Sequence, residues 1–116
     1  MKINNDLIKT RTILWTNSNP TNSFPSQTIT LSESLDNYKY YEILFRQSTN
    51  DARIMATGKI PVGYGTILLW FATTNFYRPT DTIVSGNTIT FSDCKNSSGT
   101  TDNERTIPYK VIVYKH

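Results

Sequence analysis

The chain has 116 residues, of which 37% are hydrophobic, 12% aromatic and 18% charged. A chain of this length forms one domain around one core, and the aromatic content argues against disorder. The formal charge of +3 comes from basic residues scattered singly along the chain, so the sequence has no basic stripe of the kind that binds nucleic acid.

Membrane, secretion and disulfide signals are also lacking in the sequence. The longest apolar run, 67–72, falls far short of the roughly 18 residues that a membrane helix requires. The N-terminal residues do not contain the apolar core of a signal peptide. The single cysteine, Cys94, cannot form an intramolecular disulfide. We therefore expect no membrane insertion, and a domain that assembles inside the cell and is held by packing alone.

Short runs of alternating apolar and polar residues are separated by turn-forming residues. The runs lie at 12–16, 27–31, 38–47, 52–57, 66–72, 76–84, 87–93 and 106–115. About eight short strands at this spacing predict an all-β fold, an antiparallel β-sandwich that is either jelly-roll-like or Ig-like. Residues 1–9 have no clear period and are predicted to form a flexible N-terminal arm or linker, while 10–116 form the single β-sandwich domain.

The second strand and the segment after it supply core residues. Ile29 and Leu31 are predicted to point inward, because they alternate with threonines. The segment 32–37 is predicted to make one helical turn that Ser32 caps and Leu35 fastens to the core.

The strand at 38–47 has the richest apolar alternation in the chain. Tyr41, Ile43 and Phe45 share one face, and we expect the rest of the domain to pack around it. Turn-forming residues follow, so the segment 52–57 is predicted to return beside this strand as a hairpin.

The run at 66–72 is apolar on both strand faces and is predicted to be the most buried strand. A small domain has little with which to cover a second apolar face. Leu68 and Trp70 are therefore the candidate residues of an oligomer interface.

The next strand, 76–84, contains Pro79, which marks an edge or a bulge. A tight turn after it would place Ile89 opposite either Ile83 or Val84, and the sequence leaves both pairings open.

The segment 94–105 has no aliphatic or aromatic residue and is predicted to be an exposed loop. The final strand, 106–115, is predicted to be docked in the sheet. One face of this strand carries Ile107, Tyr109, Val111 and Val113.

The sequence does not contain the residues that common catalytic sites need. Its only histidine is His116 at the C-terminus, so neither a zinc site nor a base for a nucleophile is expected. Four carboxylates could supply the catalytic pair of a glycoside hydrolase. We prefer to interpret them as charged side chains of loops that are exposed to solvent. They are Asp81, Asp93, Asp102 and Glu104. We expect no enzyme activity, cofactor or metal.

Aromatic side chains are the one binding resource, because a ring can stack on the apolar face of a sugar while polar neighbours bind its hydroxyl groups. Trp15, in a strand pattern, is expected in the core or in an interface. Tyr64 adjoins a turn, as do Tyr77 and Arg78, and these three are the candidate ligand-binding residues.

Part of the sequence resembles a module of tail-tip, baseplate and tail-fibre proteins of bacteriophages and prophages. The resemblance lies in 14–31 (LWTNSNPTNSFPSQTITL), 35–38 (LDNY) and 41–46 (YEILFR), and 105–111 (RTIPYKV) looks like the final strand of that family. It implies a β-rich structural domain of the virion tail, assembled in the bacterial host cytoplasm. It also implies other tail proteins as partners and a homo-oligomer, with a trimer favoured over a dimer.

Together these features predict a non-enzymatic phage or prophage structural module that is tail-associated and contacts the host surface. The alternative is a carbohydrate-binding module that recognises a host cell-wall glycan. A glycan hydrolase is the third and least favoured hypothesis.

Overall fold

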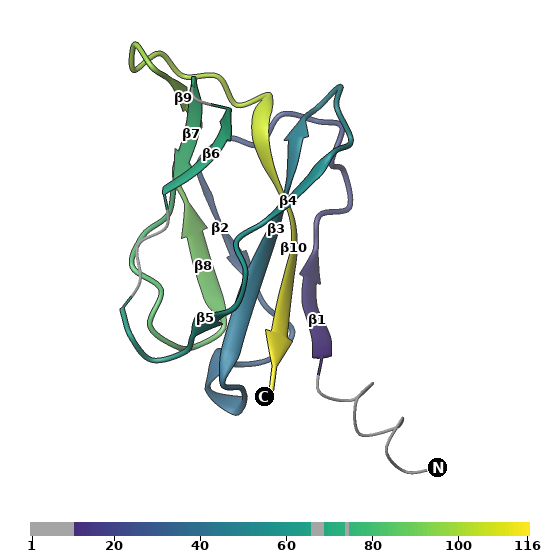
Figure 1. Cartoon of the computed structure of the whole chain (residues 1–116), viewed down its shortest axis with the longest axis vertical. Coiled ribbons are helices and arrows are strands. Elements are labelled where there is room, and N and C mark those ends of the chain that lie inside the picture. The colour runs from purple at the N-terminus through teal and green to yellow at the C-terminus, as the bar shows by residue number, and fades with distance from the viewer. Residues whose placement is uncertain (1–10, 66–68, 74) are drawn as a thin grey trace.

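The computed structural model describes residues 11–65, 69–73 and 75–116, and for 69–73 it describes the backbone alone. In this part of the chain the fold is all-β, and the strands pair antiparallel in two layers (Figure 1). The strands are β1 (Arg11–Thr16), β2 (Gln27–Thr30), β3 (Tyr40–Ser48), β4 (Ile54–Ala56), β5 (Ile60–Pro61), β6 (Leu69–Thr73), β7 (Phe76–Pro79), β8 (Thr88–Phe91), β9 (Lys95–Asn96) and β10 (Arg105–Tyr114). The predicted antiparallel β-sandwich is confirmed.

The first layer has the strand order β1-β10-β3-β4, and β5 also pairs with β3. Strand β3 is therefore an interior strand, as its alternation predicted. Tyr41, Ile43 and Phe45 are each fully buried. The predicted hairpin is confirmed, because Phe45 of β3 lies opposite Met55 of β4.

The second layer contains the pair β2-β8 and the three-stranded set β6-β7-β9. An isolated bridge between Thr80 and Phe91 joins the two parts. The first strand thus pairs with the last and the second with the eighth, which is the nested pairing of a jelly roll. Across the two layers, the rings of Phe45 and Phe91 meet edge to face at 6.2 Å.

The partner of β8 differs from both predicted pairings. Ile89 lies opposite Ile29 of β2, instead of Ile83 or Val84. The strand before it ends early, at Pro79, which cannot donate a backbone hydrogen bond. Thr80 still bridges Phe91 of β8, and farther along the chain the carbonyl group of Val84 accepts a hydrogen bond from the Gly63 amide at 2.8 Å.

Strand β10 departs from regular alternation. The register shifts between Pro108 and Lys110, so a bulge removes Tyr109 from the inward face on which alternation placed it. Tyr109 is half-buried, whereas the three other residues of that predicted face are fully buried. They are Ile107, Val111 and Val113.

The predicted helical turn is a short 3-10 helix over Leu35–Asn37. Leu35 is fully buried, as expected, but the cap is Ser34 and not Ser32. The Ser34 hydroxyl accepts a hydrogen bond from the Asp36 amide at 3.1 Å, because the helix begins later than the sequence suggested. Ile29 and Leu31 are buried, also as predicted.

Two predictions fall outside the described residues. The proposed N-terminal arm, 1–9, and Leu68 are not described at all, and Trp70 belongs to β6 without a described side chain. The arm and the oligomer interface therefore stay predictions.

Candidate binding groove at Trp15

The three candidate ligand-binding residues are not brought together. Tyr64 is 77% exposed and lines a cleft of about 390 Å³ with Tyr38 and Tyr40, at the start of β3. Tyr77 lies half-buried in β7, opposite Lys95 of β9, in the other layer. A ligand-binding role for Tyr64 and Tyr77 stays a prediction.

Arg78 lies inside the protein, with a fully buried side chain, so it does not offer its guanidinium group to a ligand at the surface. The guanidinium donates to three backbone carbonyl groups, of Thr106 at 2.8 Å, Ser92 at 2.9 Å and Arg105 at 3.2 Å. The sequence suggested an exposed residue because a turn was expected nearby. The planar fork of donors instead ties β7 to the start of β10.

The charge of Arg78 is retained in this buried setting. Burial lowers the pKa of its guanidinium group to about 10, which still leaves it protonated at neutral pH. A buried cation costs free energy unless its donors are satisfied, and the three carbonyl groups satisfy this one.

We call the hydrogen bonds from the Arg78 guanidinium group to these three carbonyl groups the Arg78 clamp, and Thr106 is the clamped residue with an unusual backbone conformation. It is the one residue other than glycine with a positive φ in the described part of the chain, at 49°. This conformation is unfavourable for a β-branched side chain and persists only where the surroundings impose it. The bond from Arg78 to the Thr106 carbonyl group supplies part of that restraint.

Cys94 was expected in an exposed loop and is instead fully buried. Its Sγ atom lies 3.6 Å from the Thr106 hydroxyl oxygen, and its burial raises the pKa of the thiol. The prediction of exposure holds for most of the segment that follows, which includes the short strand β9.

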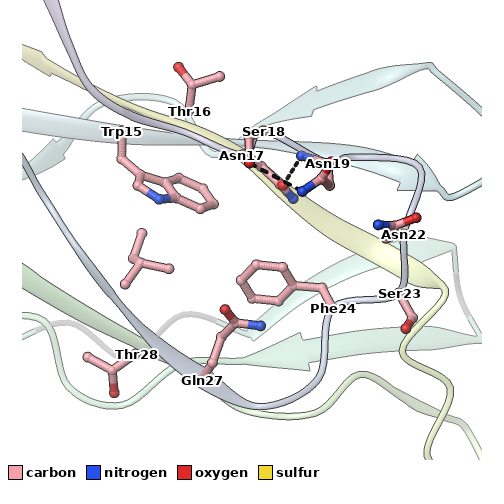
Figure 2. A pocket seen from close by; sticks show the side chains of 11 residues that line it. Trp15, Thr16, Asn17, Ser18, Asn19, Asn22, Ser23, Phe24, Gln27 and Thr28 are labelled. Atoms are coloured by element: carbon pink, nitrogen blue, oxygen red, sulfur yellow. Dashed lines mark hydrogen bonds between the residues drawn. The ribbon is translucent and has the colours of Figure 1, made fainter.

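A groove of about 450 Å³ lies between the end of β1, the loop after it and β2. Figure 2 shows the Trp15 ring at the left and the Phe24 ring near the centre, with Asn17 and Asn19 to the upper right and Gln27 below Phe24. The groove is lined by Trp15, Thr16, Asn17, Ser18, Asn19, Asn22, Ser23, Phe24, Gln27, Thr28 and Ile29. The sequence placed Trp15 in the core or in an interface and did not identify this site.

A bulge explains the position of Trp15. The pairing of β1 with β10 shifts between Ile13 and Trp15, so half-buried Trp15 lies opposite the buried Val111 instead of on the outer face with the exposed Ile13. Bulges commonly redirect a side chain in this way. The Trp15 ring thus packs partly on the core and partly lines the groove.

Trp15 and Phe24 form the aromatic wall of the groove, which packs against the core. The Trp15 and Phe24 rings meet edge to face with centroids 6.3 Å apart, and Phe24 meets Phe91 in the same way at 5.7 Å. Such contacts fix the orientation of the rings. Phe24 and Ile29 retain only 6% and 5% exposure, so they present little apolar surface to the groove, whose lining is mostly polar.

The loop that carries the polar wall is held at its beginning by β10. The Asn17 amide donates to the Tyr109 carbonyl group at 2.8 Å, and the Asn17 side chain donates to that of Pro108 at 2.9 Å. Asn17 Oδ1 also accepts from the Asn19 amide at 2.8 Å. Both polar atoms of the Asn17 side chain therefore bond to the protein itself, and these bonds hold the loop in its conformation.

The end of the same loop is held by the segment after β8. The Phe24 amide donates to the Asn103 carbonyl group, and the Ser26 amide donates to the Asp93 carboxylate, each at 2.9 Å. Asn103 Nδ2 donates to the same carboxylate oxygen at 2.9 Å. The Ser26 and Asn103 bonds lower the pKa of Asp93 below its usual value. A loop held at both ends presents its side chains with little ordering cost on binding.

The groove offers hydrogen-bonding groups without formal charge. Every lining residue is uncharged, and none of these side chains can exchange a proton near neutral pH. Over the described residues there is no group of three or more His, Cys, Asp or Glu that could hold a metal ion. In the same ranges, no helix has the length and apolar character needed to cross a membrane.

Comparisons with models of protein families, with curated proteins and with solved structures each find no match to this chain.

Proposed function

We propose that this chain is a non-enzymatic module of a phage or prophage tail, and that the Trp15 groove binds glycan on the host surface. The observation that carries the glycan part is the combination of a half-exposed indole ring with an uncharged lining rich in side-chain amides and hydroxyls. The resemblance of 14–31, 41–46 and 105–111 to tail proteins supports the virion part. The segment 14–31 also contains most of the groove.

The physical argument follows from what a sugar offers to a protein. A pyranose ring has an apolar face that packs on an indole, and hydroxyl groups at its edge that exchange hydrogen bonds with amides and hydroxyls. Trp15 provides the first kind of surface, and Asn19, Asn22 and Gln27 contribute side-chain amides to the lining. Because the aromatic wall and the loop are already held in place, a sugar would meet a preorganised site.

A glycan array with the purified wild-type chain tests this proposal. We expect binding to a restricted set of glycans, and the Trp15→Ala variant should weaken it by at least about tenfold, the equivalent of one aromatic contact and its buried area. Tyr64→Ala is the matched control, because it removes an exposed aromatic ring from the separate cleft next to Tyr38 and Tyr40. Loss of binding in Tyr64→Ala with retention in Trp15→Ala would move the site to that cleft.

The structural role in the virion makes a separate prediction. A tail component is expected to form a homo-oligomer with other tail proteins as neighbours, and a trimer is the state favoured by the resemblance. Light scattering on the purified chain measures this directly. A trimer without any glycan binding would support the structural role and contradict the recognition role. A monomer that binds glycan would support the recognition role and contradict the structural role.

A further inference from the structure

We infer that the free edge of β2 is a docking site for an extended strand of another protein, which pairs with β2 and fills the space between β2 and β1. The inference goes beyond the proposed function, because it requires neither glycan binding nor a place in a virion. Two observations carry it. Alternate backbone groups of β2 point away from β8, and β1 does not cover them.

One hydrogen bond shows which backbone groups of β2 face β8. The Leu31 amide donates to the Asn87 carbonyl group at 2.6 Å, just beyond the last pair of the two strands. Alternate residues of an antiparallel strand bond to the same neighbour, so the amide and carbonyl groups of Ile29 also face β8. Those of Thr28 and Thr30 therefore face the other way.

A hydrogen bond on the far side of β8 agrees with this assignment. The Thr90 carbonyl group accepts from the Asp81 amide at 2.9 Å, so the backbone of Thr90 faces away from Thr28, the residue opposite it in β2. The two threonines instead share a hydrogen bond between their hydroxyl groups, at 2.7 Å. In the part of the chain that the structure describes, β2 pairs only with β8, and the backbone groups of Thr28 and Thr30 form no other hydrogen bond.

Strand β1 meets this edge at one point and leaves the rest uncovered. The Ser32 amide donates to the Leu14 carbonyl group at 3.0 Å. Ser32 lies two residues after Thr30, so this bond also shows that the free side of β2 faces β1. Farther along, the groove of about 450 Å³ separates the end of β1 from β2.

An extended polypeptide is the partner that such an edge fits. Its N–H and C=O groups repeat every two residues, roughly 7 Å, which is the repeat of the free groups of Thr28 and Thr30. Edge strands usually carry a charge, a proline or a bulge that prevents pairing with another chain. Residues 26–32 contain neither a charged residue nor a proline, and the register of β2 with β8 is unbroken.

The two faces of β2 indicate the side chains of the partner strand. Thr28 and Thr30 are exposed on the outer face, where threonine or valine makes a favourable cross-strand neighbour. Ile29 points into the core, so the partner residue on that face should be apolar. Lys110 lies opposite Thr16 at the end of β1, and a basic residue at that end of the partner would be repelled.

Hydrogen exchange followed by NMR tests the inference with a strand peptide. The probe is an acetylated and amidated peptide with the sequence of residues 26–32 (SQTITLS), which has the required alternation. In the free chain, the amides of Thr28 and Thr30 should exchange at least about tenfold faster than those of Ile29 and Leu31. Saturating peptide should slow the two threonine amides by at least about tenfold.

Three results would overturn the inference. The first is a peptide that leaves the exchange of Thr28 and Thr30 unchanged. The second is slow exchange of both amides in the free chain at every concentration, which would mean that the chain itself covers the edge. The third is slow exchange that disappears on dilution, which would make a second copy of this chain the occupant.

A proline at the free edge gives an independent test. Thr28→Pro removes an amide that does not bond to β8, so the β2-β8 pairing and the circular dichroism should be preserved. Its affinity for the peptide should fall by at least about fivefold, the equivalent of one hydrogen bond. Thr28→Ala is the matched control, because it loses the hydroxyl bond to Thr90 but keeps the amide, and its affinity should change by less than about twofold.

Unchanged peptide affinity in a folded Thr28→Pro chain would overturn the inference. If that variant does not fold, hydrogen exchange in the wild type decides alone. The glycan array separates this inference from the proposed function. Glycan binding that depends on Trp15, without peptide binding, would overturn only the strand site, whereas peptide binding without glycan binding would support the strand site and contradict the glycan proposal.

Discussion

The guanidinium group of Arg78 lies over the ring of Phe24, with its central carbon 5.4 Å from the ring centroid. One face of the aromatic wall is thereby in contact with the buried clamp that holds Ser92, Arg105 and Thr106. Arg78 was one of the three residues that the sequence suggested for ligand contact. In the structure Arg78 instead packs against the Phe24 ring, which lines the groove.

Replacing Arg78 should destabilise the domain strongly. In Arg78→Met the buried carbonyl groups of the clamp lose their donors, and each unsatisfied acceptor costs about 1 to 3 kcal/mol, so the free energy of unfolding should fall by roughly 3 kcal/mol or more. Arg78→Lys should recover only part of this loss, because one ammonium group cannot reproduce a planar fork. Urea unfolding followed by fluorescence measures both values.

Arg53 provides the comparison for this experiment. Its side chain is 79% exposed and pairs with Asp51 at the surface, so Arg53→Met should change the stability by less than about 1 kcal/mol. If Arg78→Met unfolds at the same urea concentration as Arg53→Met, the clamp does not hold the layers together.

The parts of the fold that could be predicted from sequence are those that local alternation decides. Strand β3 is an example. The spacing of its apolar residues alone predicts that Tyr41, Ile43 and Phe45 are buried, and all three are buried. The partner of β8 could not be predicted in this way. The pairing of Ile89 with Ile29 joins distant parts of the chain, and it depends on where the intervening segments leave the sheet.

The groove was missed for a related reason. The position of Trp15 at the core margin depends on a bulge that sets it opposite the buried Val111 of β10, and a bulge has no signature in a run of alternating residues. The Asn-rich segment after β1 was the only local signal, and it equally fits an ordinary turn. Arg78 was misplaced because its role depends on Thr106, whose positive φ the sequence does not reveal.

The Asp93 carboxylate should contribute stability that depends on pH. Its pKa is lowered by the hydrogen bonds from Ser26 and Asn103, so the folded state favours the ionised form. The contribution is therefore fully present above the usual carboxyl pKa of 3.8 and is lost as the pH falls through the lower pKa of the folded state. Above pH 5 or so, the wild type should be more stable than Asp93→Asn.

Thermal unfolding between about pH 2 and pH 6 measures this difference, and the gap between the two proteins should close in acid. Asp51 has a lowered pKa as well, so only the difference between wild type and Asp93→Asn isolates the contribution of Asp93. A gap that stays constant over this range would show that the Asp93 hydrogen bonds do not depend on its charge.

The thiol of Cys94 should react slowly in the native protein. It is fully buried, and burial raises its pKa, so little of the reactive thiolate is present or accessible. Reaction with a disulfide reagent at pH 8 should be at least about a hundredfold slower than in urea, where the thiol becomes accessible. Equal rates with and without urea would mean that the segment around Cys94 opens readily.

Mapping the bound sugar on the chain by NMR tests the central claim most directly. The backbone amides and the Trp15 indole of a ¹⁵N-labelled chain would be followed during titration with the glycan that binds most tightly on the array. The account predicts shifts clustered at Trp15, Asn19, Asn22, Phe24 and Gln27, around the groove of Figure 2. Shifts clustered instead at Tyr38, Tyr40 and Tyr64, or a spectrum that does not change at saturating sugar, would contradict it.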